Sequence, residues 1–149
     1  MNLSGTNPLR GFQDETLGPR FVNLINAYDS SLRTRFKKIA KKAKIKIREG
    51  VYTWIAGPSY ETEAEVKMFR KLGGDLIGMS TVPEVVVARQ IGLEVAAISC
   101  VTNLLTSSQR KILTHEEVMK QAGKNQERLA RLLEAFLPLL RLRGGWGEL

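Results

Sequence analysis

Three apolar runs typical of β-strands occur in this chain, and each is followed by the pattern T-x-x-E. The runs are GVYTWIAG (50–57), DLIGM (75–79) and LEVAAISCVTN (93–103). The patterns are Thr62 to Glu65, Thr81 to Glu84 and Thr114 to Glu117. A threonine followed three residues later by a glutamate forms a capping box at a helix start. Strands that alternate with helices predict an α/β protein with right-handed crossovers and a largely parallel sheet flanked by helices.

The other segments complete one domain, since 149 residues are enough to bury a hydrophobic core. We expect a loop over residues 1–19 and a helix over 20–44. The helix after Thr62 is expected to end at Gly73-Gly74 and the next one at Gly92, because glycine commonly follows a helix C-terminus. The last helix runs from His115 to about Leu137 and is interrupted by Pro138. The predicted domain is 1–137 and the tail is 138–149, of which RLRGGWGEL (141–149) is expected to be frayed.

Composition narrows the class of protein. The chain is 43% hydrophobic and 26% charged, which is typical of a soluble globular protein. The single cysteine, Cys100, excludes an intrachain disulfide, and its apolar neighbours predict a buried, inert thiol rather than a reactive one. No apolar run approaches the ~20 residues of a membrane span. The first residues lack a secretion signal, so we expect a cytoplasmic protein that does not bind membranes.

The net charge of +8 raises the question of a nucleic-acid partner. Nine of the 23 Lys and Arg residues fall within 33–50. Apolar residues recur there at helical spacing and leave the lysines on the opposite face. No aromatic residues are interleaved among the charges as a single-strand-binding surface requires. A solvated amphipathic helix is therefore favoured over a nucleic-acid-binding helix.

Polar side chains follow the predicted strands at the sheet edge where open α/β proteins bind ligands. They are Glu61, Ser80 beside Met79, Asn103 and His115. Each also has a structural interpretation: Glu61 favours the helix dipole, Ser80 and Asn103 are turn residues, His115 is exposed surface, and Met79 is core. Together they can hydrogen-bond a flat polar heterocycle and a sugar. The sequence contains no metal-ligand spacing, glycine-rich phosphate loop or nucleophile elbow.

Several longer stretches carry a family resemblance that spans about residues 3 to 137. They are GTNPLRG, RFVNLINAYDSSLR, EGVYTWIAGPSYETEAE, KLGGDLIGMSTVPEVVVARQIGLEVAAISCVTN and THEEVM. The chain closely resembles the C-terminal half of the trimeric, low-molecular-mass purine nucleoside phosphorylases. The resemblance implies a partial three-layer phosphorylase fold and the phosphorolysis of inosine or guanosine to base and ribose 1-phosphate. It implies orthophosphate as co-substrate, no cofactor, no metal and a homotrimer.

The resemblance also implies a role for individual residues. Glu61 would accept hydrogen bonds from N1–H and the 2-amino group of the base, and Asn103 would bond N7 and O6 and stabilise the departing purine. Tyr60 would pack beside the base and Met79 against the sugar. His115 would contact the ribose 5′-hydroxyl and Ser80 would help bind phosphate. Phe21 would reach into the site of a neighbouring subunit. Glu61, Asn103 and His115 are the predicted catalytic residues.

The same residues favour 6-oxopurines over adenine. The related methylthioadenosine phosphorylases prefer aspartate at Asn103 and lack the glutamate at Glu61, and a site built on polar matching rejects the wrong base strongly. The family's glycine-rich turn and phosphate-binding arginine and histidine have no counterpart in the chain. LLTSSQRK (104–111) also departs from the family pattern.

Three hypotheses therefore stand. The first is a family member whose chain is a fragment or split product that needs a missing N-terminal half. The second is a purine-binding module without catalysis. The third, which is less favoured, is a basic nucleic-acid-binding protein. The incomplete sheet is expected to expose an apolar edge.

Overall fold

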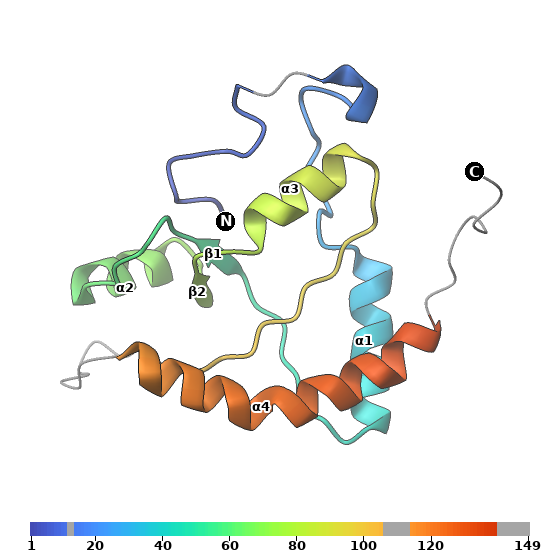
Figure 1. The fold of residues 1–149 in the computed structure, drawn as a ribbon, viewed down its shortest axis with the longest axis vertical. Coiled ribbons are helices and arrows are strands. Elements are labelled where there is room, and N and C mark those ends of the chain that lie inside the picture. Colours follow the sequence, from blue (N-terminus) through green and yellow to red (C-terminus); the bar gives the residue numbers. More distant parts are fainter. Residues whose placement is uncertain (12–13, 106–113, 140–149) are drawn as a thin grey trace.

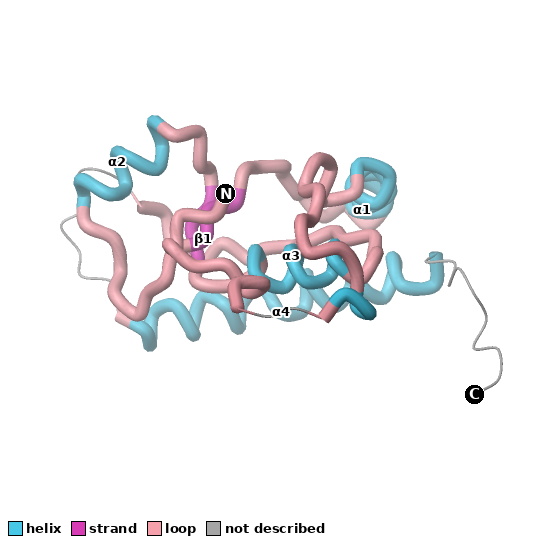
Figure 2. Tube along the Cα trace, turned by 90° about the horizontal axis from the view of Figure 1, so that it is seen from above, coloured by secondary structure: helices cyan, strands magenta, loops and turns pink. Residues whose placement is uncertain are grey.

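The structure, a computed structural model, describes residues 1–11, 14–105 and 114–139. Its helices are α1 (Ser30–Lys42), α2 (Glu63–Lys71), α3 (Val82–Gln90) and α4 (His115–Phe136), its strands are β1 (Tyr52–Trp54) and β2 (Leu76–Gly78), and short 3-10 helices cover Glu15–Leu17 and Leu137–Leu139. The α1 and α2 helices lie at opposite ends of the molecule, and α4 spans the distance between them in both views (Figures 1 and 2). The sheet lies between these ends, with α3 beside it.

The sheet is parallel, as the sequence predicts. Tyr52 pairs with Leu76 and Trp54 with Gly78 in the β1–β2 ladder. The other edge of β1 is bonded by the first residues of the chain, with a parallel bridge between Asn2 and Trp54. Residues 1–3 therefore run beside the sheet, although the sequence indicates only loop there. Both strands are shorter than the apolar runs that contain them. The α/β class, a small parallel sheet flanked by helices, is confirmed.

The α2 helix begins with the predicted capping box. The Oγ1 of Thr62 accepts from the backbone N–H of Glu65, and the Glu65 carboxylate accepts from the Thr62 backbone N–H at 2.8 Å. The helix ends at Lys71, and Gly73 follows with a φ of 85°. That left-handed conformation is one that glycine adopts without strain. Short-range chemistry thus determines both ends of α2.

The carboxylate of the capping box makes α2 sensitive to acid. Hydrogen bonds from the Thr62 backbone and hydroxyl hold the pKa of Glu65 below its ordinary 4.5. The bonds stabilise the charged form, so their contribution is present above that value and is lost as pH falls through the lowered pKa. We expect the free energy of unfolding to fall with acidification partly through this group.

Glu65→Gln tests this expectation, because glutamine keeps the capping geometry but does not titrate. Urea unfolding compared at about pH 7 and about pH 3 should show a smaller acid-induced loss in the variant. Glu63→Gln, at an exposed site in the same helical turn with no cap bond to its side chain, is the control. An equal acid loss in Glu65→Gln and wild-type protein would contradict the role of this carboxylate.

The capping pattern fails at α3 and holds in part at α4. At the α3 N-cap, Thr81 makes no side-chain cap bond, and its φ of 74° and ψ of −52° place it in a γ-turn in which the Val82 N–H donates to the Ser80 carbonyl at 2.8 Å. This correction has a geometric reason, because an N-cap residue normally has extended backbone angles and Thr81 does not. At α4, the Thr114 hydroxyl accepts from the Glu117 N–H at 3.3 Å.

The α1 helix is an amphipathic surface helix, as the spacing of its apolar residues predicts. It begins at Ser30 rather than at 20, because the Asp29 carboxylate caps it by accepting from the Leu32 N–H at 2.8 Å. Its buried side chains are Leu32, Ile39 and Ala40, whereas its lysines are exposed. The buried face packs on α4, and this contact forms the main hydrophobic cluster.

The third predicted strand does not form. Residues 93–103 run as an extended segment without secondary structure, and most of them are exposed. Cys100 is exposed as well, which contradicts the buried thiol predicted from its apolar neighbours. A strand is defined by pairing with a neighbour, and the described chain places no strand alongside this segment. The apolar run predicts a paired and buried strand, but within the described chain no neighbouring strand pairs with it.

Other expectations concern the ends of the chain and its helices. The α4 helix ends at Phe136, and Pro138 lies in the 3-10 turn that follows it, so the predicted end is confirmed. The segment that we expected to be frayed, residues 141–149, lies outside the described residues. Within the described ranges, every helix is too short or too polar to traverse a lipid bilayer.

Candidate functional site

The Glu61 carboxylate stands just before the α2 N-cap, as the sequence predicts. The capping box is complete without it, because Thr62 and Glu65 satisfy each other. Glu61 is half-buried and makes no hydrogen bond or ion pair with any described residue. A partly shielded carboxylate without a partner is free to accept hydrogen bonds from a ligand.

The loop that carries Tyr60 and Glu61 is held against the end of β2. The Ile55 N–H donates to the Gly78 carbonyl at 3.0 Å and so extends the β1–β2 pairing by one bond. Gly57, with a φ of 65°, packs its backbone on Met79, and a β-carbon there would clash with the Met79 sulfur. Met79 is 40% exposed, so it is a surface residue rather than core. The loop that carries Tyr60 and Glu61 and the segment that carries Met79 thus meet at one end of the strand pair.

Asn103 lies at the end of the extended segment and is half-buried. Its Oδ1 is buried and has no hydrogen-bond partner among the residues that the structure describes. A buried acceptor without a partner is costly, by about 1–3 kcal/mol, and such groups are uncommon in folded proteins. An ordinary turn residue would satisfy this atom locally, so the ligand-binding interpretation of Asn103 is favoured over the structural one.

Arg70 joins the Asn103 segment to α2. Its guanidinium donates to the carbonyl of Leu105 at 2.6 Å, two residues beyond Asn103. The opposite, N-terminal end of the same helix is capped by Thr62, which directly follows Glu61. The bond therefore ties the Asn103 segment to the end of α2 that is remote from Glu61, roughly 10 Å away along the helix axis. That Glu61 and Asn103 contact one ligand remains a prediction. Arg70 was not predicted from the sequence, and the residues around it offer no signal for this bond.

The other predicted residues are exposed. Tyr60 is 40% and Phe21 87% exposed, and the Arg20 guanidinium lies 5.7 Å from the Phe21 ring centroid. Ser80 is exposed, and its hydroxyl lies 3.2 Å from that of Thr81. His115 is exposed at the first position of α4. No hydrogen bond joins Phe21 or His115 to the other predicted residues within the described chain, so their convergence remains a prediction.

Two backbone features of the site were not predicted from the sequence. Gly57 is required for its positive φ and for the close approach of Met79, and the Gly-Pro pair is a signal that could have indicated a turn there. The γ-turn at Thr81 gives a non-glycine residue a positive φ beside Ser80. Such strained conformations cost about 1–3 kcal/mol and cluster at functional sites. The turn therefore supports a functional role for the GMST segment (78–81).

The arrangement supplies acceptors, an amide and a hydroxyl, together with a thioether and an aromatic ring. These groups suit a neutral heterocycle better than a metal ion. In the described ranges, no group of three or more His, Cys, Asp or Glu side chains is placed to hold a metal. LLTSSQRK, whose position bears on His115, falls mostly within residues 106–113, outside the described chain.

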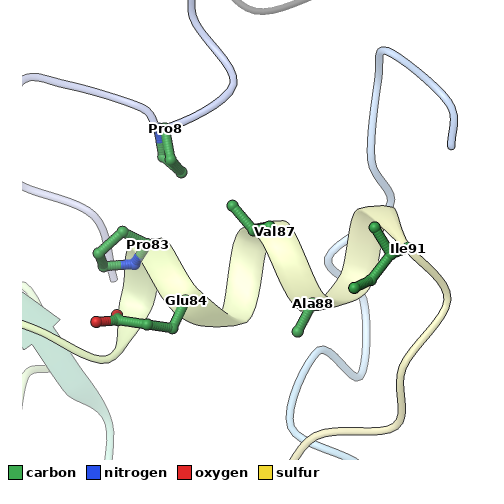
Figure 3. Close-up of a pocket in the computed structure, with 6 residues that line it drawn as sticks. All are labelled: Pro8, Pro83, Glu84, Val87, Ala88 and Ile91. Atoms are coloured by element: carbon green, nitrogen blue, oxygen red, sulfur yellow. The ribbon is translucent and has the colours of Figure 1, made fainter. Parts of the chain in front are cut away.

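A separate groove of about 460 Å³ lies along α3 (Figure 3). Its lining residues are Pro8, Pro83, Glu84, Val87, Ala88 and Ile91. Pro8 of the N-terminal loop faces Val87 across it. None of the predicted site residues lines this groove, and its single charged side chain, Glu84, cannot by itself recognise a polar ring. We therefore place the candidate site at the sheet edge and not in this groove.

Comparison with known proteins identifies relatives across almost the whole chain. The model of the phosphorylase superfamily matches residues 1–138. Purine nucleoside phosphorylase 1 of Bacillus subtilis is 44% identical over 137 residues, which are 92% of this chain and 51% of that protein. The chain spans about half the length of the curated relatives it matches.

Solved structures agree with the sequence relatives. Schistosoma mansoni purine nucleoside phosphorylase in complex with adenosine superposes with a TM-score of 0.90 at 36% identity. The match covers 95% of this chain and 53% of that one. A schistosome purine nucleoside phosphorylase in complex with hypoxanthine gives the same TM-score, identity and coverage. The arrangement of α1 to α4 around the small sheet is thus half of a larger known fold.

Proposed function

Because the chain belongs to the phosphorylase superfamily, we propose that it supplies the base-reading half of a purine nucleoside phosphorylase. The proposed reaction is the phosphorolysis of inosine or guanosine to the free base and ribose 1-phosphate. One observation supports the proposal most: within the described chain, the Oδ1 of Asn103 is buried without a hydrogen-bond partner, and the half-buried Glu61 carboxylate has no partner either. A 6-oxopurine presents N–H groups on one edge and N7 with O6 on another, so it matches both groups.

The proposed chemistry centres on the departing base. The N9–C1′ bond breaks and its electron pair passes into the purine ring, while a phosphate oxygen forms the new bond to C1′. The purine takes up one proton from solvent at N7, which balances the proton that hydrogen phosphate gives up to solvent. Asn103 lowers the barrier by donating its amide N–H to O6 and accepting from the N7 proton, because preorganised groups aimed at developing charge stabilise the transition state. Glu61 fixes the base by accepting from N1–H and, in guanine, from the 2-amino group.

The remaining residues complete the proposed site. Tyr60 packs beside the base, Met79 lies against the sugar, His115 contacts the ribose 5′-hydroxyl and Ser80 contributes to phosphate binding. The 40% exposure of Tyr60 and Met79 supports their availability to a ligand. We place Phe21, which is 87% exposed, at the site of a neighbouring subunit in a homotrimer. A phosphate dianion also requires cationic partners, so we assign its main binding groups to the half of the relatives that this chain does not cover.

The proposed preference is for 6-oxopurines, because the Asn103 amide can donate to O6 whereas adenine presents a 6-amino donor. Schistosome purine nucleoside phosphorylases have been solved with hypoxanthine and with adenosine. Adenosine is therefore the most informative competing substrate for this chain.

The proposal is tested by coexpressing the chain with the part of the Bacillus subtilis enzyme that it does not match. We expect the coexpressed pair to release hypoxanthine from inosine only when phosphate is present, and adenosine to react more slowly. The chain alone is expected to release none. A purified pair that forms a complex but does not cleave inosine or guanosine would contradict the proposed reaction. Robust activity from the chain alone would contradict the assignment of phosphate binding to the other half.

A further inference from the structure

The basic segment over residues 33–50 is a feature of the chain that the proposed function does not use. Nine of the 23 Lys and Arg residues lie there, with a single acidic residue, Glu49. Glu49 pairs with Arg33 at 2.7 Å and with Lys37 at 2.9 Å. The Arg35 guanidinium lies 5.9 Å from the Phe136 ring centroid. The other six side chains, which we call the basic surface, are exposed and make no hydrogen bond or ion pair with any described residue: Lys38, Lys41, Lys42, Lys44, Lys46 and Arg48.

The backbone beneath the basic surface is fixed by the hydrophobic core. The first three of its lysines lie on α1, whose apolar face is buried against α4. Beyond the helix, Ile45 and Ile47 are half-buried and pack on the same cluster. Lys44, Lys46 and Arg48 alternate with these isoleucines and are exposed. The six cations therefore belong to a folded part of the chain that presents them to solvent.

Helix stability explains only part of this charge. Lys41 and Lys42 lie in the last turn of α1, where cations interact favourably with the helix dipole. Lys44 follows the helix with a φ of 56°, at a position where glycine is the favoured residue. Lys46 and Arg48 lie beyond the last turn, to which the dipole effect is confined. The fold therefore gives no reason for a cation at any of these last three positions.

We propose that the basic surface binds the phosphate backbone of a double-stranded nucleic acid. Lys and Arg side chains that neutralise phosphates bind a duplex without regard to its sequence. Single strands are bound differently, because their bases stack on aromatic side chains. No aromatic ring of this segment is free for such stacking, since Phe36 is stacked on Phe136. Charge without a stacking platform matches a duplex, whose bases are already stacked inside it.

An anionic membrane is the alternative partner, and the packing of α1 argues against it. An amphipathic helix that binds a membrane buries its apolar face at the boundary between headgroups and acyl chains. The apolar face of α1 is already buried against α4. A protein partner is a poorer match as well, because lysine is depleted at the centres of protein interfaces.

The inference does not rest on the proposed phosphorolysis. The basic surface contains none of the residues assigned to the purine site. Burying unpaired ammonium groups beneath further polypeptide would be costly. The basic surface is therefore expected to face water in a longer protein as well.

The experiment measures binding of the full chain to labelled DNA and RNA duplexes of mixed sequence by fluorescence anisotropy. Affinity is expected to fall by about 10²–10³-fold between about 50 mM and 200 mM salt, which corresponds to about four to six phosphate contacts. The double variant Lys44→Gln/Lys46→Gln is expected to bind roughly tenfold or more weakly at the lower salt concentration and to reduce the slope of log K against log salt by about 2.

Lys67→Gln/Lys71→Gln on α2 is the matched control, because it removes the same charge from exposed positions at the opposite end of the molecule from α1 (Figure 1). It is expected to leave the salt slope unchanged. Binding of either duplex supports the proposal, and the tighter of the two identifies the kind of nucleic acid.

Four results would overturn the proposal. They are absence of duplex binding, binding that does not depend on salt, an equal loss of affinity in the two double variants, and tighter binding to phosphatidylserine vesicles than to either duplex.

Discussion

Replacing Phe136 by alanine is expected to lower the free energy of unfolding by about 3–5 kcal/mol. Phe136 is 3% exposed, and its ring stacks on Phe36 with the two centroids 3.5 Å apart and the planes inclined by 13°. This pair joins α4 to α1 within the cluster that contains Leu32 and Leu132. Small domains are stable by only about 5–15 kcal/mol. The loss would therefore be a large fraction of the total stability.

Leu137→Ala is the control for this variant, because the adjacent Leu137 is 57% exposed and its change is expected to fall within about 0.5 kcal/mol. Urea unfolding followed by circular dichroism measures both. If the two variants were equally stable, the α1–α4 contact would not be the principal core of the chain.

Replacing Asn103 by leucine is expected to reduce kcat/KM for inosine by about 10²–10³-fold in the coexpressed pair. Leucine has a similar shape but removes both the amide donor and the Oδ1 acceptor, which is buried and unpartnered in the structure. Removing an unsatisfied polar group carries no folding penalty of its own, so the protein is expected to remain at least as stable as the wild type. A large loss of activity without a loss of stability would identify a ligand-binding role.

Two further variants sharpen this test. Asn125→Leu on α4, where the side-chain amide donates to the Gln121 carbonyl at 3.4 Å, is the control and is expected to retain activity. Asn103→Asp keeps an acceptor but loses the donor to O6, so its preference is expected to shift from inosine toward adenosine. An Asn103→Leu enzyme as active as Asn125→Leu would place Asn103 outside the site.

Local features of the fold were predictable from the sequence, whereas those that depend on distant neighbours were not. The capping box at Thr62 and the stop at Gly73 involve residues within a few positions of each other, and both are confirmed. The length of β1 and the absence of a strand over 93–103 depend on what lies alongside. The prediction that Cys100 is buried was wrong for the same reason. Apolar neighbours in the sequence indicate burial only when another segment covers them.

In the candidate site, too, local features were predictable from the sequence and long-range contacts were not. The position of Glu61 outside a complete cap followed from spacing alone. The contact of Gly57 with Met79 and the bond from Arg70 to Leu105 join residues that are far apart in the chain, and neither was foreseen. At Thr81 the T-x-x-E pattern predicted a cap, but the residue forms a γ-turn and makes no side-chain cap bond. The first of these contacts holds the loop before Tyr60 and Glu61 against Met79, and the second holds the segment after Asn103 against the C-terminal end of α2.

The central claim is that Glu61 and Asn103 bind a single purine, and calorimetry with guanine tests it on the chain itself. Wild-type protein is expected to bind guanine with a roughly micromolar Kd, and Glu61→Gln to bind about 10–100-fold more weakly, because a carboxylate that accepts two N–H groups is lost. Glu63→Gln, at the exposed start of α2, is expected to bind as the wild type does. Absence of guanine binding by the wild-type chain, or equal binding by both variants, would contradict the claim.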